Sequence, residues 1–504
     1  GPLKMKREEL LAKLSRSRED NKQEPSPYIV VKRGISERVA REISALLAEA
    51  GAKDKRVEKR LRGFSFEPDN ARIYPNGSML CHVIGFVNSN NVGVDGIERS
   101  CEQYLAGNDG FRYIEHDRTG RELVPYRGQE RPPRDGFNVR LTIDMAVQQI
   151  VEQELDAAVK QFRPKMAVGI VMRPQTGEIL AMANRPNFDL NDIHRSGEED
   201  RRNRAITDPV EPGSTFKIVT VSAIFDKRLV RPDDLIFCEN GYYKLYALTD
   251  SHPHGNLTVQ EVLIKSSNIG VAKLALQLGE QNLYEYERLF GFGDRTGVLL
   301  PFETGGIVHP PHSWSKRSIS RVPIGQEVAV SPLQMAVAMS AIANGGSLMI
   351  PQIISEVREA DGTVVSSCHP QFVRTVAAKS AIDSVREALE QVPTPKGTAR
   401  LAAVPGFKVA GKTGTAQKYR NGKPVHDRHL CSFIGYLPAD APEFTVLVMI
   451  DEPVTAPEQD MGGLVAAPVF SRIAGRIARH VNLIPAPEPP QGGLVATQPA
   501  VSRR

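Results

Sequence analysis

Two groups of strand-like segments, far apart in the sequence, constrain the fold of this 504-residue chain more than any other feature. Residues 166–172 and 178–182 are apolar runs joined by Arg173-Pro174-Gln175-Thr176-Gly177, a pattern that predicts a hairpin. Three later runs also predict strands, at residues 407–410, 431–437 and 444–450. The segment between the two groups has mostly helical periodicity. We therefore predict an α+β fold, in which helices cover an antiparallel sheet built from both ends of one domain.

Changes in composition divide the chain into three parts. Residues 129–136 contain two prolines and four charged residues, which predicts a linker and a domain boundary near residue 135. We expect residues 1–135 to form an irregular N-terminal domain and residues 136–484 to form the domain with the sheet. Residues 485–504 are rich in Pro, Gly, Gln and Ser, and we expect a disordered tail.

Local patterns add detail to both domains. Residues 82–87 are a short strand-like run in the first domain. In the second domain, residues 138–142 predict a strand, and Asp144 stands where it can cap a helix that extends to Phe162.

The composition excludes several classes of function. The net charge of +5 is small, and no basic stripe interleaved with aromatic residues predicts a nucleic-acid partner. The five cysteines are scattered singly without metal-ligand spacing, so we expect no metal site, no cofactor and no disulfide framework. No apolar run reaches the roughly 18–20 residues that cross a bilayer. Gly1-Pro2-Leu3 resembles a cloning remnant, so we expect that the native N-terminus is not displayed.

The first of three chemical motifs is Glu211-Pro212-Gly213-Ser214-Thr215-Phe216-Lys217, followed by an apolar helical run. Ser214 would lie in the first helical turn, where free N–H groups and the helix dipole favour an anion. Lys217, three residues later, would lie on the same helix face. A serine nucleophile needs a neighbouring base, and a lysine can serve if burial and a nearby positive charge lower its pKa. Alone, the motif also fits a capping serine and a solvated lysine.

The second motif, Ser266-Ser267-Asn268, follows a predicted helix at residues 257–265. A hydroxyl and an amide two residues apart can face one cleft, where Ser266 could relay a proton and Asn268 could bind a peptide group. Alone, the motif also fits a polar loop or a helix cap.

The third motif is Lys412-Thr413-Gly414-Thr415, which follows the strand-like residues 407–410. Strand periodicity places Lys412 and Gly414 on one face and the two threonines on the other. Glycine permits close approach at a strand edge, where a substrate could bind as an added strand. The lysine could hold the lysine of the first motif neutral, and a threonine could bind a carboxylate. Alone, the motif also fits an ordinary edge strand.

Ser-x-x-Lys, Ser-x-Asn and Lys-Thr-Gly in this order resemble the signature set of the penicillin-binding and serine β-lactamase superfamily. The flanking residues resemble the division-type class B penicillin-binding proteins over most of residues 70–480. This resemblance is carried by Arg202-Asn203-Arg204-Ala205, residues 211–217, 264–268, 411–418 and 462–470, and in the first domain by residues 72–77, 96–98 and 104–107.

The resemblance implies that residues 136–484 are a transpeptidase domain and residues 1–135 a non-catalytic pedestal. It implies a serine-type D,D-transpeptidase that cross-links peptidoglycan stem peptides in septal wall synthesis and is a target of β-lactams. Ser214 would attack the D-alanyl-D-alanine bond, Lys217 would accept its proton, and Ser266 and Lys412 would pass a proton to the departing D-alanine. Asn268 would hold the substrate amide.

The same resemblance assigns Thr413, Gly414 and Thr415 to substrate binding: a threonine hydroxyl holds the carboxylate, and Thr415 N–H joins Ser214 N–H in an oxyanion hole. Expected partners are a membrane-embedded glycosyltransferase and other division proteins. The expected location is the inner membrane, with the catalytic domain in the periplasm or at the cell exterior and the anchor missing from this chain. Two alternatives stay open: a hydrolase (a β-lactamase or D,D-carboxypeptidase) and a β-lactam sensor or scaffold.

Overall fold

The computed structural model describes residues 2–3, 5–15, 29–61, 63–67, 70–113, 115, 130–420, 423–456 and 459–485. The chain forms two compact units, Gly1–Pro75 with Val87–Val94, and Asn76–Phe86 with Asp95–Arg504. The contacts thus divide the chain well before residue 135. For example, the N–H of Leu80 donates to the Glu152 carboxylate at 2.8 Å within the second unit. The functional boundary near residue 135 stays a prediction, and residues 486–504 of the predicted tail lie outside the described residues.

The first unit contains helices α1 (Arg7–Ser15), α2 (Glu37–Lys53) and α3 (Lys55–Leu61). Helix α2 begins after Ser36, whose hydroxyl accepts a hydrogen bond from the Val39 N–H at 3.4 Å and so caps the helix. Within the described residues, no helix combines the length and the apolar character that a membrane span requires.

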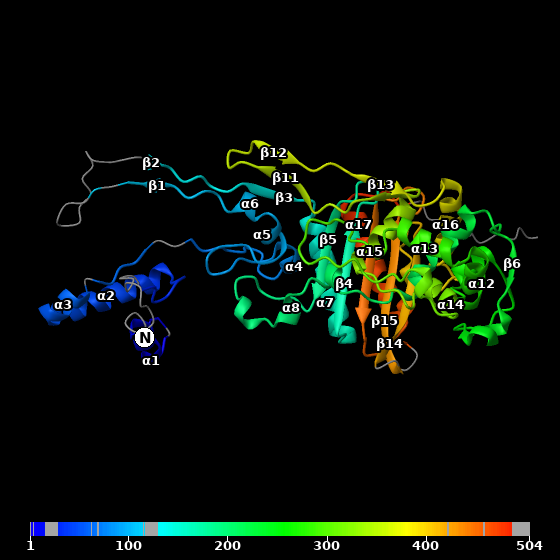
Figure 1. Ribbon diagram of the computed structural model, residues 1–504, viewed down its shortest axis with the longest axis horizontal. Helices are drawn as coiled ribbons and strands as arrows, with labels where there is room; N and C mark the ends of the chain where they lie inside the picture. The colour runs from blue at the N-terminus through cyan, green and yellow to red at the C-terminus, as the bar shows by residue number, and fades with distance from the viewer. Residues whose placement is uncertain are drawn as a thin grey trace, which may run out of the picture. The chain divides into compact units, whose positions relative to one another are not determined.

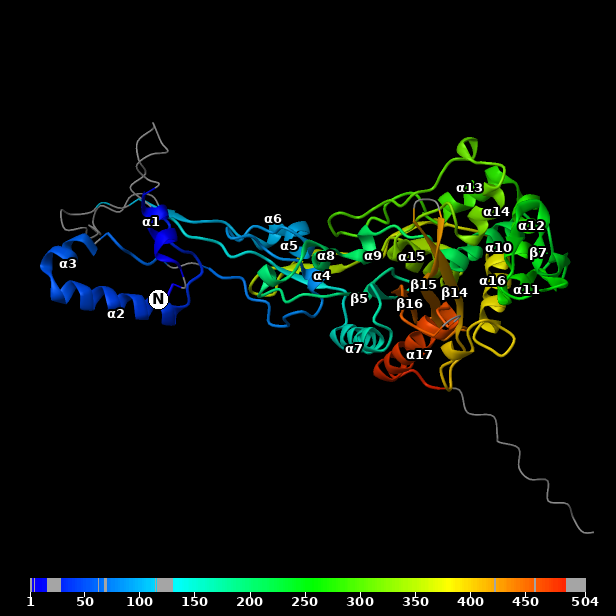
Figure 2. The same ribbon diagram turned by 90° about the horizontal axis from the view of Figure 1, so that it is seen from below.

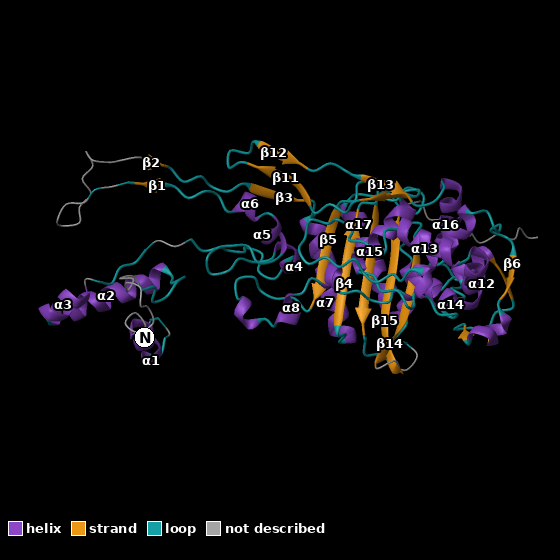
Figure 3. Cartoon of the chain, viewed as in Figure 1, coloured by secondary structure: helices purple, strands orange, loops and turns teal. Residues whose placement is uncertain are grey.

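A five-stranded antiparallel sheet forms the centre of the second unit, and its strands lie side by side in Figures 1 and 3. Its order is β14-β15-β16-β4-β5, so strands from the two ends of the domain meet where β16 pairs with β4. Strands β4 and β5 form the predicted hairpin. The strands are β4 (Met166–Met172), β5 (Ile179–Arg185), β14 (Ala410–Arg420), β15 (Lys423–Leu437) and β16 (Phe444–Asp451).

Helices cover both faces of this sheet. Helices α7 (Met145–Phe162) and α17 (Gly462–His480) pack together on one face, as Figure 2 shows. Asp144 caps α7 as predicted, since its carboxylate accepts hydrogen bonds from the N–H groups of Ala146 at 2.9 Å and Val147 at 3.1 Å. Helix α15 (Pro332–Ala343), buried along its whole length, packs on the opposite face against β4, β15 and β16. The sheet is therefore buried on both faces, as its apolar strands require.

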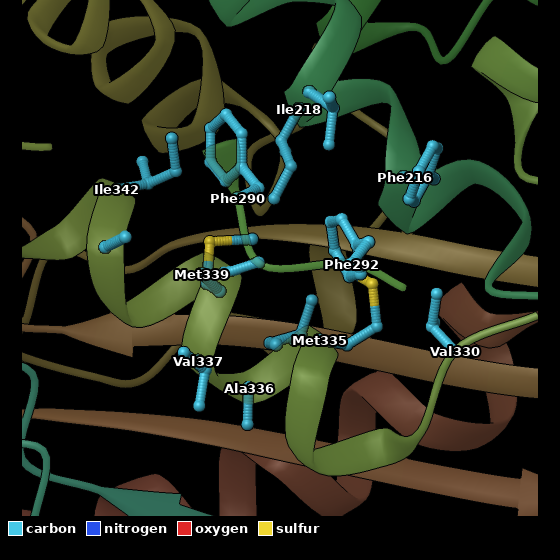
Figure 4. Close-up of a cluster of buried hydrophobic side chains, with 14 of the residues drawn as sticks. Phe216, Ile218, Phe290, Phe292, Val330, Met335, Ala336, Val337, Met339 and Ile342 are labelled. Atoms are coloured by element: carbon cyan, nitrogen blue, oxygen red, sulfur yellow. The ribbon is translucent and has the colours of Figure 1, made fainter. Parts of the chain in front are cut away.

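A helical subregion continues from α15 and carries two of the three chemical motifs. Its helices are α10 (Lys217–Asp226), α11 (Val259–Ile264), α12 (Asn268–Leu278), α13 (Glu280–Leu289), α14 (Ser318–Arg321) and α16 (Lys379–Gln391). Figure 4 shows the core that anchors it, where Phe216 and Ile218 face Phe290, Phe292 and Met335. The ring centroids of Phe216 and Phe292 are 4.9 Å apart. The start of α10 is thereby fixed against the sheet domain.

Short elements complete the second unit. The helices are α4 (Cys81–Ile84), α5 (Gly96–Ser100), α6 (Glu102–Leu105), α8 (Glu198–Arg201) and α9 (Arg204–Thr207). The strands are β1 (Phe111–Arg112), β2 (Glu130–Arg131), β3 (Asn138–Leu141), β6 (Leu235–Phe237), β7 (Tyr242–Tyr243), β8 (Leu248–Thr249), β9 (Asn256–Thr258), β10 (Ser347–Met349), β11 (Ile354–Arg358), β12 (Val364–Ser367) and β13 (Phe372–Thr375).

Two strand predictions were wrong. Residues 82–87 contain a helical turn, α4, because Gly85 bends the chain at φ +73° where it packs against the backbone of Asp95. Residues 407–410 do not form a strand of their own: Phe407 closes a turn back to Val404, and β14 begins at Ala410 and includes the third motif itself.

Candidate active site

Ser214 lies in a 3₁₀ turn, Gly213–Phe216, that leads directly into α10. This turn is fixed by Gly213, which has φ +57° and donates its N–H to the Gly325 carbonyl at 3.2 Å. Gly325 itself has φ +79°, and a Cβ there would lie 2.2 Å from the Gly213 oxygen, so only glycine fits. The Ser214 side chain is partly exposed, and its hydroxyl makes no hydrogen bond to any described residue. It is thus accessible to a substrate.

Lys217 is fully buried at the first position of α10. Its Nζ donates to the Ser266 carbonyl at 2.5 Å, to the Asn268 Oδ1 at 2.8 Å and to the Ser266 Oγ at 3.2 Å. Burial lowers the pKa of Lys217 from 10.5 to about 7, although the charge of Asp250 opposes this shift. At neutral pH a large share of the amine is therefore unprotonated, which is the state that a general base requires.

The second motif connects α11 and α12, as expected. Ser266 adopts φ +60°, an uncommon conformation for a residue with a side chain. Ser267 caps α12, because its Oγ accepts a hydrogen bond from the Gly270 N–H at 2.9 Å. Asn268 is the first residue of α12, and its Nδ2 donates to the Thr249 carbonyl at 2.9 Å. The strained turn thus directs Ser266 and Asn268 toward Lys217.

The third motif lies on β14 with the predicted alternation. The Lys412 Nζ donates to the Ser266 Oγ at 2.8 Å, while Gly414 packs against Thr215, on the side of Ser214. The two threonines alternate with these residues along the strand, and the Lys412 Nζ also donates to the Thr413 hydroxyl at 3.4 Å. The Thr413 hydroxyl is 2.9 Å from that of Thr398, and the Thr415 hydroxyl accepts a hydrogen bond from the Gly462 N–H at 3.0 Å. Their binding of a substrate carboxylate stays a prediction.

The structure therefore brings the residues of all three motifs together, and Ser266 links the two lysines. Both lysines are fully buried, and both contact the Ser266 Oγ. Burial lowers the pKa of Lys412 well below 10.5, and the charge of Lys217 lowers it further. We expected Lys412 to be the charge that holds Lys217 neutral. Burial is instead the main cause at both lysines, and their repulsion disfavours a state in which both are protonated.

Sequence reasoning missed Asp250, which positions the second motif. Its carboxylate accepts hydrogen bonds from the Ser267 hydroxyl at 2.6 Å and from the N–H groups of Asn268 and Ile269 at 2.5 and 3.0 Å. A carboxylate at a helix N-terminus stabilises that end of the helix. The sequence gives no indication of this role, because an aspartate 16 positions before Ser266 has no regular spacing with the motif.

No group of three potential metal ligands occurs among the described residues.

Comparisons with known proteins identify both parts of the chain. Residues 167–475 match the penicillin binding protein transpeptidase domain, and residues 2–141 match the penicillin-binding protein dimerisation domain. Stage V sporulation protein D of Bacillus subtilis is 35% identical over 447 residues, which are 88% of this chain and 67% of that protein. Peptidoglycan D,D-transpeptidase FtsI of Escherichia coli is 31% identical over 426 residues, which are 84% of this chain and 70% of that protein.

A solved structure agrees with these relatives. Penicillin binding protein 3 from Mycobacterium tuberculosis, complexed with ampicillin, is 33% identical and superposes with a TM-score of 0.74 over 83% of this chain and 91% of that chain. The predicted α+β fold with helices on both faces of an antiparallel sheet is confirmed. The chain belongs to the penicillin-binding proteins, and within them to class B of the division type.

Proposed function

We propose that this protein is a serine-type peptidoglycan D,D-transpeptidase that acts in septal wall synthesis and is acylated by β-lactams. One observation carries the proposal: the Ser266 hydroxyl lies between the amines of two fully buried lysines, Lys217 and Lys412, and the partly exposed Ser214 is three residues before Lys217. Buried lysines with lowered pKa values are typical of proton-transfer sites. The names of the relatives and the ampicillin complex support the same activity.

The acylation step follows from this arrangement. The Ser214 oxygen bonds to the carbonyl carbon of the penultimate D-alanine as its proton passes to Lys217. The carbon–nitrogen bond then breaks, and a proton reaches the departing D-alanine amine through Ser266 and Lys412. Backbone N–H groups of Ser214 and Thr415 would stabilise the oxyanion, a contribution of about 3 kcal/mol per donor. Asn268 would bind the substrate amide.

The second step transfers the acyl group. An amine of a neighbouring stem peptide attacks the ester carbon, the bond to Ser214 breaks, and Ser214 regains a proton from the attacking amine through Lys217. Water in place of the amine would give the hydrolase alternative. A β-lactam acylates Ser214 in the same way, but the amine released from its ring stays attached to the acyl group. This tethered group keeps the acceptor amine away from the Ser214 ester, so the second step is blocked.

The intact mass of the protein after incubation with benzylpenicillin tests the proposal. We expect a persistent adduct of one equivalent in the wild type and in Ser313→Ala, which alters an exposed serine, and none in Ser214→Ala. A short-lived adduct with rapid loss of the drug would favour a β-lactamase. No adduct on folded wild-type protein would exclude serine acylation and favour a scaffold or sensor.

We also propose that residues 1–135 form a non-catalytic platform for division proteins, including a membrane-embedded glycosyltransferase, and that residues 136–484 act on the cell wall outside the inner membrane. The match of residues 2–141 to a dimerisation domain supports a role of the first part in assembly. Co-purification of the glycosyltransferase with the full chain, compared with a chain that lacks residues 1–75 of the first unit, would test it.

A further inference from the structure

A pocket of about 560 Å³ lies beside the candidate active site. One wall is the segment that leads to the nucleophile and includes Asp208 and Glu211, and the other is the part of β14 beyond the third motif, with Gln417 and Lys418. Glu211 is three residues before Ser214, and Gln417 is two residues after Thr415. The pocket therefore continues the active site along the strand edge.

Most charges around this pocket are neutralised within the protein. Arg202 and Arg204 both pair with Asp208, at 2.6 and 2.9 Å. Lys418 pairs with Asp451 at 2.6 Å and with Glu452 at 2.9 Å.

Two further charges differ from this pattern. Lys165 is exposed at the rim, and its charge acts on Asp451. Glu211 forms no ion pair with any basic side chain in the described part of the chain. Among the described residues that line the pocket, Asp208 and Asp451 each pair with a basic side chain, whereas Glu211 does not.

The surroundings of Glu211 favour a cation from outside the protein. Its carboxylate accepts a hydrogen bond from the Glu327 N–H at 3.2 Å, and the side chain is only partly exposed. Burial raises the pKa of Glu211, and the nearby negative charge of Glu327 raises it further, although that backbone N–H lowers it. A bound ammonium group would offset both unfavourable effects by supplying an opposite charge.

The direction of the substrate indicates which group reaches this pocket. This step depends on the proposed function. A donor stem peptide that lies along β14 has its leaving D-alanine near Lys412 and its scissile carbonyl near Thr415. Residues before the two D-alanines must then lie beside Gln417 and Lys418, since a strand advances about 3.3 Å per residue. Every stem peptide that can accept a cross-link has an amine-bearing residue, so a donor stem has one as well.

We propose that this pocket binds the free ammonium group of the donor stem peptide, and that Glu211 is the specificity-determining residue that pairs with it. The enzyme would then prefer donor stems whose amine has not already been cross-linked or otherwise acylated. Glu211 acts in donor recognition and takes no part in the proton transfers at Ser214.

Two matched β-lactams test this pairing. In both, 6-aminopenicillanic acid is acylated with Nα-acetyl-lysine; the ε-amine is free in one compound and acetylated in the other. The amide at position 6 takes the place of the peptide bond to the residue before the two D-alanines. The measured quantity is the ratio of the two second-order rate constants for acylation of Ser214, followed by intact mass. Because the ratio is taken within one variant, general losses of activity cancel.

We expect the β-lactam with the free ε-amine to acylate the wild type about fivefold faster than the acetylated compound. A partly exposed ion pair typically contributes a factor of this size. The ratio should fall to about one in Glu211→Gln and recover in part in Glu211→Asp. Glu285→Gln removes the same charge from an exposed position on α13 and should keep the wild-type ratio. In the wild type, the ratio should also fall as salt is raised from about 0.05 to 0.5 M.

A ratio near one in the wild type, or an unchanged ratio in Glu211→Gln, would overturn the inference. The salt series decides the question if Glu211→Gln fails to fold, because a ratio that is independent of salt excludes an ion pair. Benzylpenicillin separates the two proposals. If it forms its adduct on Ser214 while the ratio is one, only the role of Glu211 fails. If it forms none on the wild type, the proposed transpeptidase chemistry fails.

Discussion

The pKa of Lys217 predicts how acylation depends on pH. Burial lowers this pKa from 10.5 to about 7, and only the neutral amine can accept the proton of Ser214. With a pKa of about 7, the neutral fraction is about 0.9 at pH 8 and about 0.1 at pH 6. The second-order rate constant for acylation by benzylpenicillin should therefore fall roughly tenfold between pH 8 and pH 6. An unperturbed lysine would instead give a rate that rises until about pH 10.

The assay is time-resolved intact mass from pH 5.5 to 9 at constant ionic strength, with thermal unfolding measured at each pH to show that the protein stays folded. Lys227→Met alters a partly exposed lysine just after α10 and should keep the wild-type profile. A rate that is constant between pH 6 and 8, or a midpoint near 10, would refute the assignment of Lys217 as the base.

Three further changes have expected outcomes. Asp250→Asn should move the midpoint of that pH profile downward, because the carboxylate raises the pKa of Lys217; an upward shift would contradict this. Lys217→Met should abolish acylation. It should also raise the free energy of unfolding in urea at pH 7 by about 1–3 kcal/mol, because burial of the Lys217 amine opposes the protonation that this amine has in the unfolded chain. That gain should shrink as the pH rises from 7 to 10.5, where both states lose the proton. Gly325→Ala should slow acylation and lower stability, because its Cβ would overlap Gly213; Gly345→Ala, also at positive φ but in open space, should leave acylation unchanged.

The sheet could be predicted because its strands are apolar and are bounded by turn residues. The hairpin of β4 and β5 and the helix capped by Asp144 follow from local patterns that tertiary structure does not override. Residues 82–87 show where such patterns fail. This short run resembled a strand, but the bend at Gly85 and its close packing against Asp95 impose a helical turn. Those contacts join segments that the sequence alone does not bring together.

The motif residues of the site were predictable from their order, whereas their electrostatics were not. Sequence patterns predicted a shared site for Ser214, Lys217 and Lys412, but the contact of both lysines with Ser266 depends on a turn with φ +60° that no propensity favours. Asp250 was missed for the same reason, since its link to the second motif exists only in three dimensions. The causes of the lysine pKa shifts likewise depend on how completely α10 and β14 are covered.

The two buried lysines support the proposed proton-transfer site over a merely structural polar cluster. A structural cluster in a protein core usually balances its charges, as the buried Arg185 does with Glu152 and Asp156 of α7. Lys217 and Lys412 have the same sign, contact one hydroxyl and form no ion pair with a described carboxylate. Such an arrangement lowers the stability of the folded protein, and a variant with apolar side chains of similar size at both positions would be more stable. The energetic cost is understandable if the site must hold one proton between two amines and deliver it through Ser266.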